Sequence, residues 1–343
     1  MRADQGAIDR AVALLQAGEL VAFPTETVYG LGADAANPLA VGRIFSVKGR
    51  PADHPLIVHL PGADSIERWA QDVPACAWEL AEAFWPGPLT LILRRAAAIP
   101  AIVCGGQETI GLRVPAHPVA LALLRSYAAA GGGVYGLGGI AAPSANRFGR
   151  ISPTAAEHVR DELGDAVSLI LDGGRCQVGI ESTIVDLSAG ADGPLRLLRP
   201  GHVTPEQIAA VTGILPQSSD ASAPRVSGSL AAHYAPATPL RLVSTPRLVS
   251  AVDDILRQGR RCALLHYSEV SATAVVDSAR QLPPNPGGYG YALYAALRAL
   301  DQSGVDVIVV EAIPSTPAWA AVGDRLQRAV CGSGAAGSAG QTP

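Results

Sequence analysis

Lys48 is the one lysine in this sequence of 343 residues, although lysine and arginine together number 26. Arg50 follows across Gly49, and His54 comes four residues later. An ammonium is a compact charge that suits a single phosphoryl oxygen, whereas a planar guanidinium can donate hydrogen bonds to two oxygens at once. One of each beside a glycine is typical of a loop that binds a polyphosphate. The alternative is a solvated cation at a helix end, where the helix dipole favours positive charge.

A second polar group lies in the stretch "APSANRFGRISPT". Ser144, Asn146 and Ser152 stand there around Arg147 and Arg150, just after a predicted strand. Hydroxyl and amide groups at a strand end suit polar contacts with a ligand, and simple turn formation is the alternative.

A third set of candidates is spread over strands and a linker. Thr109 and Arg113 occupy alternate residues of "TIGLRVP", so both face the same side of a strand. An arginine in a buried strand needs a partner, which is either a carboxylate ligand or a structural acid. Ser182 begins the strand "STIVDL", and His233 with Tyr234 forms an aromatic pair in a segment that is otherwise typical of a linker.

The overall composition restricts the class of protein. With 48% hydrophobic and 16% charged residues the chain should be globular, and a net charge of −4 argues against nucleic-acid binding through bulk charge. The five cysteines are scattered and form no C-x-x-C pair, so neither a zinc site nor a disulfide framework is predicted. Without a signal peptide or a membrane-spanning apolar run, we expect a soluble cytoplasmic protein with no metal site.

Periodicity predicts a mixed α/β domain over residues 1–213. Apolar spacing predicts helices, and short apolar runs predict strands, whereas the glycine-rich stretch 25–38 reads as a loop. The predicted helices span 8–17, 38–47, 75–84, 117–129, 154–163 and 204–211. The predicted strands span 20–24, 56–60, 89–93, 109–115, 139–144, 168–174, 182–187 and 195–200. So many strands among few helices favour a twisted mixed sheet with flanking helices.

Beyond this domain, residues 214–239 have the Ser, Ala and Pro content of a linker. Strands and helices then alternate regularly over 240–330, which predicts a smaller Rossmann-like α/β domain. Residues 331–343 are predicted to be a disordered tail.

Two glycine patterns, "GLGADA" from Gly30 and "GLGGIA" from Gly136, fit the dinucleotide fingerprint G-x-G-x-x-G/A. That fingerprint needs its first glycine directly at a strand end and a helix opening through the motif. Gly30 is the sixth residue after the strand ends, and Asn37-Pro38 interrupts the chain just after the motif, so we reject a nicotinamide oxidoreductase. The second copy lies in a glycine-rich insertion at 129–138, to which we assign no site.

Taken in order, the blocks "PTETVYGLGADA", "KGRP", "HPLIVHL", "FWPGPLTLIL", "GLRVP", "APSANRFGRISPT", "GIESTIVDL", "LRPG" and "HYAP" resemble the YrdC family. The resemblance covers about residues 8–330 and is to its long two-domain form, the threonylcarbamoyl-AMP synthases. It implies formation of L-threonylcarbamoyladenylate, pyrophosphate and water from L-threonine, bicarbonate or CO₂, and ATP, for threonylcarbamoyladenosine modification of tRNA. The carbamate on the threonine amine can attack the α-phosphate itself, so catalysis rests on positioning and charge neutralisation. Magnesium is expected on the phosphates, and tRNA threonylcarbamoyltransferase machinery is expected to take the product.

The resemblance also implies roles for individual residues. The paired K-x-R and S-x-N signatures, which we expect to be catalytic, are Lys48, Arg50, Ser144 and Asn146. The implied ATP contacts are Lys48, Arg50, His54, Thr109, Ser144, Ser152 and Arg199, with His233 or Tyr234 closing over the nucleotide as a lid. The implied threonine contacts are Thr27, His59, Arg113, Ala142 and Ser182, with Arg113 on the carboxylate.

Two other classes of function compete with this one. An RNA-binding YrdC-like module in tRNA or rRNA maturation would use a basic patch such as Arg94/Arg95 with Arg147/Arg150, and weak binding of tRNA would be salt-sensitive. A carbamoyl-phosphate-dependent maturation enzyme with a YrdC-like domain would also carry zinc-finger cysteine pairs, which this sequence lacks.

Overall fold

The computed structural model describes residues 3–270 and 276–334. Its internal contacts divide the chain into two compact units, each of which has its own fold. The first unit runs to Phe148 and resumes over Pro153–Ser229. The second unit consists of Gly149–Ser152 and the chain from Leu230 onward.

The helices of the first unit form where apolar periodicity predicts them, and the predicted ends agree with the observed ends within 3 residues. A short helix, α3, precedes the strand β4 and was not predicted. The helices are α1 (Gln5–Gln16), α2 (Pro38–Lys48), α3 (Ile66–Trp69), α4 (Ala75–Phe84), α5 (Pro118–Ala129), α6 (Ala156–Leu163) and α7 (Pro205–Thr212).

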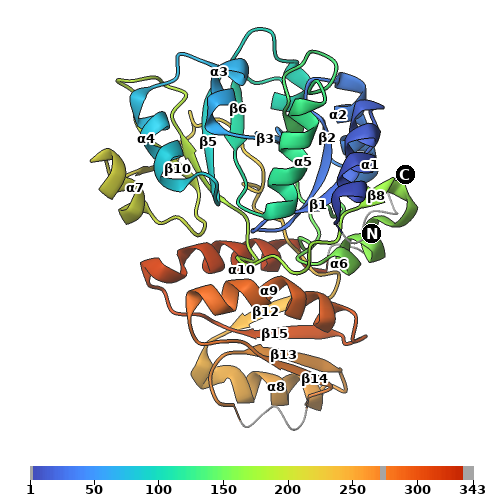
Figure 1. The fold of residues 1–343 in the computed structure, drawn as a ribbon. Coiled ribbons are helices and arrows are strands. Elements are labelled where there is room, and N and C mark those ends of the chain that lie inside the picture. Colours follow the sequence, from blue (N-terminus) through green and yellow to red (C-terminus); the bar gives the residue numbers. More distant parts are fainter. Residues whose placement is uncertain (1–2, 271–275, 335–343) are drawn as a thin grey trace, which may run out of the picture. The chain divides into compact units, whose positions relative to one another are not determined.

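The strands of the first unit build one large sheet, shown in Figure 1. Among the described residues it has 11 strands, in the order β11-β10-β9-β5-β6-β3-β7-β2-β1-β8, with β4 paired to β5. Parallel and antiparallel pairs alternate irregularly, so the predicted twisted mixed sheet is confirmed. The strands are β1 (Val21–Pro24), β2 (Tyr29–Asp34), β3 (Ile57–His59), β4 (Ala70–Gln71), β5 (Leu89–Arg95), β6 (Thr109–Arg113), β7 (Ile140–Ala141), β8 (Leu169–Ile170), β9 (Thr183–Asp186), β10 (Arg196–Arg199) and β11 (Gln217–Ser218).

The strand β2 contradicts the sequence prediction. Residues 29–34, which lie in the predicted loop 25–38, form the fully buried strand β2, paired with β1 on one side and β7 on the other. Gly32 explains the error, because a glycine inside a strand usually weakens it. Here a Cβ at Gly32 would lie 2.8 Å from the Phe23 ring and 3.0 Å from Ile140, so close packing requires the glycine.

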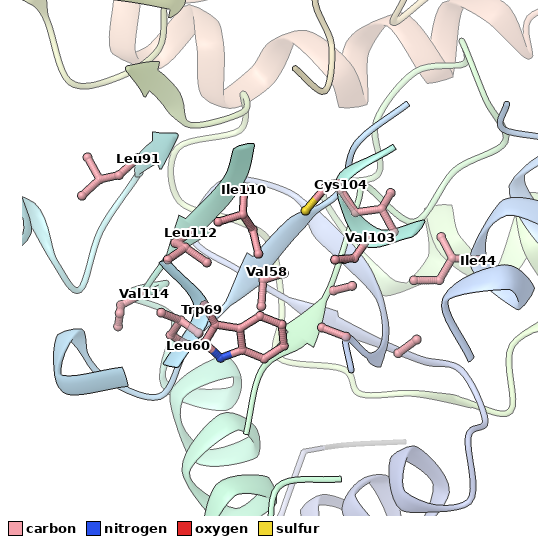
Figure 2. Close-up of a cluster of buried hydrophobic side chains, with 14 of the residues drawn as sticks. Ile44, Val58, Leu60, Trp69, Leu91, Val103, Cys104, Ile110, Leu112 and Val114 are labelled. Atoms are coloured by element: carbon pink, nitrogen blue, oxygen red, sulfur yellow. The ribbon is translucent and has the colours of Figure 1, made fainter. Parts of the chain in front are cut away.

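Two hydrophobic cores cover the two faces of this sheet. Along β1, Val21 and Phe23 belong to a core shared with α1 and α5, whereas Ala22 belongs to the larger core with α2 and α4. Side chains alternate between faces along a strand, so the two cores lie on opposite sides. In the larger core the Trp69 indole lies beside Leu60, with Val58 and Leu112 close by (Figure 2).

The second unit has a parallel sheet in the order β12-β15-β13-β14 among its described residues. Helices α9 and α10 lie on one face and α8 on the other (Figure 1), so the predicted Rossmann-like three-layer fold is confirmed. Helix α10 includes the first two residues of the predicted disordered tail, and 335–343 lie outside the described residues. The elements are β12 (Leu240–Val243), α8 (Leu248–Arg257), β13 (Cys262–His266), β14 (Ser278–Gln281), α9 (Pro286–Asp301), β15 (Val307–Glu311) and α10 (Ala320–Gly332).

The packing around Trp69 gives a prediction about stability. A Cβ at Gly139 would lie 2.3 Å from the Trp69 ring and 2.8 Å from Val58, so Gly139→Ala should destabilise the first unit by about 1–3 kcal/mol. In the matched control Gly42→Ala, the new Cβ would meet nothing within 4 Å apart from its chain neighbours and its own helix backbone, and stability should rise by up to about 1 kcal/mol. Urea unfolding followed by tryptophan fluorescence measures both. Equal midpoints for Gly139→Ala and the unsubstituted protein would contradict the packing.

Candidate active site

The two ends of α2 place the cationic pair. Asn37 caps the first turn with its side chain, and Pro38 occupies the first helical position. Gly49 ends the helix in the left-handed conformation, with φ +62°, which glycine adopts without strain. The chain therefore turns sharply between Lys48 and Arg50, and both side chains are buried.

The Lys48 ammonium joins α2 to the S-x-N loop. Its Nζ donates to the carbonyl oxygen of Ser144 at 2.6 Å and to that of Asn146, and the Phe148 amide donates to the Lys48 carbonyl at 2.8 Å. The two signatures are therefore in direct contact. Because an ammonium has three N–H groups, one remains for a ligand in the described part of the chain.

The protonation of Lys48 depends on its surroundings. Only 3% of the residue is exposed, and this burial, followed by the nearby Arg50 charge, lowers the pKa of Lys48 to about 7. The two carbonyl acceptors favour the protonated amine. The ammonium is thus close to losing its proton at neutral pH unless an anionic ligand holds it.

Arg50 contacts both the segment that follows it and the Phe148 ring. Its guanidinium donates to the carbonyl oxygen of Pro55 at 2.9 Å and lies 5.5 Å from the Phe148 ring centroid. The His54 ring packs edge-on against the same phenyl ring at 5.3 Å. Burial, and then the Arg50 charge, lower the pKa of His54, so a neutral imidazole is favoured.

Arg199 lies at the end of β10 and connects several candidate residues. It donates to the carbonyl oxygen of Ser182 at 2.9 and 3.1 Å and to the Ser182 hydroxyl at 3.1 Å. The Thr90 hydroxyl pairs with the same Ser182 hydroxyl at 2.8 Å. Arg199 also donates to the Ser227 carbonyl at 2.7 Å, while Arg50 reaches the Ser227 hydroxyl at 3.5 Å.

Part of the predicted linker packs on this site. Val226 belongs to a buried cluster with Ile92, Ile184 and Leu198 on the sheet. Thr109 lines a cavity of only about 10 Å³ beneath this segment, about the space that one water needs. In this conformation residues 223–229 therefore cover the sheet beside Thr109.

Arg113, at the end of β6, is fully embedded. Its Nε donates to the Gly87 carbonyl at 3.2 Å, Nη1 to the Thr27 hydroxyl at 3.0 Å and Nη2 to a Glu26 carboxylate oxygen at 2.6 Å. Of the two partners that the sequence left open, the structure thus contains the structural acid, and this acid is Glu26. Two Arg113 N–H groups remain for a ligand in the described part of the chain.

His59 lies next to Arg113 because β3 and β6 pair in parallel with these residues in register. Burial, and then the Arg113 charge, lower the pKa of His59 to about 3, so its imidazole is neutral. Its Nδ1 is buried and has no hydrogen-bond partner among the described residues. Ala142 is close by, because its amide donates to the Ile57 carbonyl of the same strand at 3.0 Å.

The predicted site residues thus form two groups in the first unit. Lys48, Arg50, His54, Ser144 and Asn146 make one group, and Thr27, His59, Arg113 and Ala142 make the other. Ser182 contacts Arg199, which reaches the first group through Ser227. Ser152, His233 and Tyr234 belong to the second unit.

Sequence reasoning missed Glu26, Thr90 and Ser227. Glu26 stands between two threonines and reads as a turn residue, although an acid directly after a buried strand is a usable signal. Thr90 lies inside an apolar strand, and Ser227 lies in a serine-rich stretch, so neither differs from its neighbours by residue type.

Two of the four arginines proposed for an RNA-binding patch form ion pairs. Arg94 binds Asp72 at 2.8 Å, and Arg95 binds Glu108 at 3.0 Å. Within the described ranges, no cluster of three or more His, Cys, Asp or Glu residues could hold a metal ion. None of the described helices combines the length and apolar character needed to cross a membrane.

Comparisons with known proteins agree with this geometry. Residues 13–201 match the family model described as telomere recombination, and 203–331 match that of the threonylcarbamoyl-AMP synthase C-terminal domain. The threonylcarbamoyl-AMP synthase of Bacillus subtilis is 42% identical over 95% of this chain and 93% of its own. That of Pyrococcus abyssi is 37% identical over 96% of this chain and 95% of its own.

A solved structure supports the same conclusion. The crystal structure of P. abyssi Sua5 complexed with L-threonine superposes with a TM-score of 0.85 and 35% identity, over 95% of this chain and 94% of that one. The resemblance seen in the sequence motifs is therefore confirmed over both units. The chain belongs to the threonylcarbamoyl-AMP synthase family.

Proposed function

We propose that the chain forms L-threonylcarbamoyladenylate and pyrophosphate from L-threonine, bicarbonate or CO₂, and ATP in two adjoining pockets that include the two groups of residues described above. The observation that carries this arrangement is the contact between Ser182, assigned to threonine, and Arg199, assigned to ATP. Two substrates held on either side of this contact would have their reacting groups close together. The threonine complex of the P. abyssi relative supports the amino-acid pocket.

In the nucleotide pocket, Lys48 and Arg50 bind the triphosphate, with His54 beside them. The loop of Ser144 and Asn146 holds Lys48 through carbonyl oxygens, which leaves the ammonium charge available to phosphate. The cations stabilise the charge that develops on pyrophosphate as the carbamate oxygen attacks the α-phosphate. The further ATP contacts that we propose are Thr109, Ser152 and Arg199.

In the amino-acid pocket, Arg113 binds the threonine carboxylate. The imidazole of His59 is neutral, so a ring nitrogen can form a hydrogen bond with the substrate without adding charge to the pocket. The remaining threonine contacts that we propose are Thr27, Ala142 and Ser182.

Magnesium and the cellular partners belong to the same proposal. Lys48 and Arg50 belong to the proposed phosphate site, so we expect Mg²⁺ to be held by phosphate oxygens and water and to neutralise charge on the nucleotide. The unstable adenylate would pass to tRNA threonylcarbamoyltransferase machinery in the cytoplasm, with at most weak, salt-sensitive binding of tRNA.

We further propose that residues 214–239 act as a lid between domains at 1–213 and 240–330. Tyr234 has φ +60°, stacks on Tyr294 at 5.8 Å and lies 5.3 Å from the Arg325 guanidinium. His233 packs against Tyr234 at 4.2 Å. These contacts hold the aromatic pair within the second unit, and we propose that one of its two rings closes over the bound nucleotide.

The reaction is tested by measuring pyrophosphate release with each substrate omitted in turn. Pyrophosphate release should require ATP, L-threonine and bicarbonate together. Lys48→Ala and Arg50→Ala should each remove most of this release, because the charge of the phosphates is no longer balanced. Arg94→Ala, which removes an exposed ion-paired cation, is the matched control and should retain full activity. Release without threonine would contradict the assignment.

The pKa of Lys48 predicts how ATP binding depends on pH. Below about pH 7 the amine is already protonated, whereas above it ATP must bind together with a proton, so ATP affinity should fall by up to about tenfold per pH unit. Lys48→Arg should be at least ~10-fold less active, because a planar guanidinium cannot reproduce the contacts that the ammonium makes from a single nitrogen atom. The KM of this variant for ATP should nevertheless vary less with pH, because arginine keeps its proton. Identical pH profiles, or full turnover by the arginine variant, would exclude this role.

The lid predicts a specific effect on the nucleotide. Replacing both His233 and Tyr234 by alanine should raise the KM for ATP about tenfold, because closure over the bound nucleotide is lost. Tyr135→Ala removes an exposed aromatic ring and serves as the control. An unchanged KM for ATP in the double variant would show that this pair does not close the site.

A further inference from the structure

Glu26 is a buried carboxylate to which neither pocket has yet given a role. It follows β1, and only 6% of the residue is exposed. One carboxylate oxygen accepts from Arg113 at 2.6 Å, and the other accepts from the Ala116 amide at 3.0 Å. Its backbone carbonyl accepts from the Val178 amide at 2.7 Å. Two separate segments, residues 113–116 and Val178, therefore hold this one residue in place.

The position of Arg113 depends on this acid. Arg113 is 3% exposed, and a buried guanidinium without a countercharge would be costly. The adjacent His59 cannot supply one, because an imidazole is either neutral, as here, or positively charged. Glu26 supplies the charge, whereas Gly87 and Thr27 accept neutral hydrogen bonds.

The bonds also determine what Arg113 can still offer. A guanidinium has five N–H groups, and the bonds to Gly87, Thr27 and Glu26 take one from each nitrogen. In the described part of the chain, each terminal nitrogen keeps one N–H. Two donors on one planar group suit the two oxygens of a carboxylate.

We propose that Glu26 is a positioning residue, which fixes the Arg113 guanidinium for the carboxylate of L-threonine and thereby sets the affinity for this substrate. The inference rests on the proposed role of Arg113. Glu26 need not touch the substrate, since its carboxylate oxygens already accept from Arg113 and Ala116. The ion pair is neutral as a whole, which suits a zwitterionic amino acid better than a polyanion.

The test compares Glu26→Gln with Glu19→Gln, a control that removes the carboxylate of an exposed Glu–Arg pair. In Glu26→Gln the KM for L-threonine should rise at least ~10-fold, while the KM for ATP changes less than about twofold. The preference for L-threonine over L-threoninamide, measured as a ratio of kcat/KM, should fall by a similar factor. A loss of folding alone would lower the amount of active protein and would leave that ratio unchanged.

Two more variants make the outcome decisive. Arg113→Lys should lower the same preference for L-threonine over L-threoninamide. Adding Glu26→Gln to Arg113→Lys should lower this preference little further, since both changes remove the same interaction. If Arg113→Lys has no effect on threonine, the proposed amino-acid pocket is wrong. If Arg113→Lys weakens threonine but Glu26→Gln does not, only the positioning role is wrong. Should Glu26→Gln fail to fold, Glu26→Asp keeps the charge at a shorter reach and should show a smaller shift in the same direction, and an unchanged preference would refute the role.

Discussion

The site depends on the buried positive charge of Lys48, which uncharged acceptors hold in place. The hydrogen bonds of its ammonium end on the backbone carbonyl oxygens of Ser144 and Asn146. A carbonyl satisfies an N–H group and favours the charged form, yet it carries no net charge to balance it. Such a group remains strongly attractive to an anion that enters a site of low dielectric constant. Arg113 differs, because Glu26 balances its charge.

This difference matches the two substrates. A triphosphate brings several negative charges, so cations held by carbonyl dipoles are suited to it. An amino acid brings one carboxylate together with an amine, so an arginine whose charge is already balanced is better suited to select it by geometry. The fold separates the two environments by placing Lys48 at a helix end and Arg113 at the end of a strand next to a neutral His59.

The helices were predictable from sequence because their apolar spacing and caps act locally, as in α2, which begins after the Asn37 cap and ends before Gly49, within one residue of the prediction. Contacts between distant segments were not. Gly32 reads as a loop residue until the Phe23 ring is seen to occupy the space of its Cβ. Val226 reads as part of a linker, since nothing nearby in the sequence indicates the cluster of Ile92, Ile184 and Leu198 that buries it. The K-x-R and S-x-N motifs were found by residue type, but their direct contact spans 96 residues and only the fold shows it.

The proposed phosphate site offers a physical reason why this one lysine is kept. Two of the three N–H groups of Lys48 point to carbonyl oxygens of one loop, and a third remains in the described part of the chain. A tetrahedral ammonium can serve two acceptors of the protein and one phosphoryl oxygen from a single point. A planar guanidinium holds its N–H donors on three nitrogen atoms in a fixed plane. From the same buried space, it could not donate to both carbonyl oxygens and to the ligand. In a chain that otherwise uses arginine throughout, the proposed phosphate contact would make three contacts converge on one atom, and this explains why the ammonium is retained there.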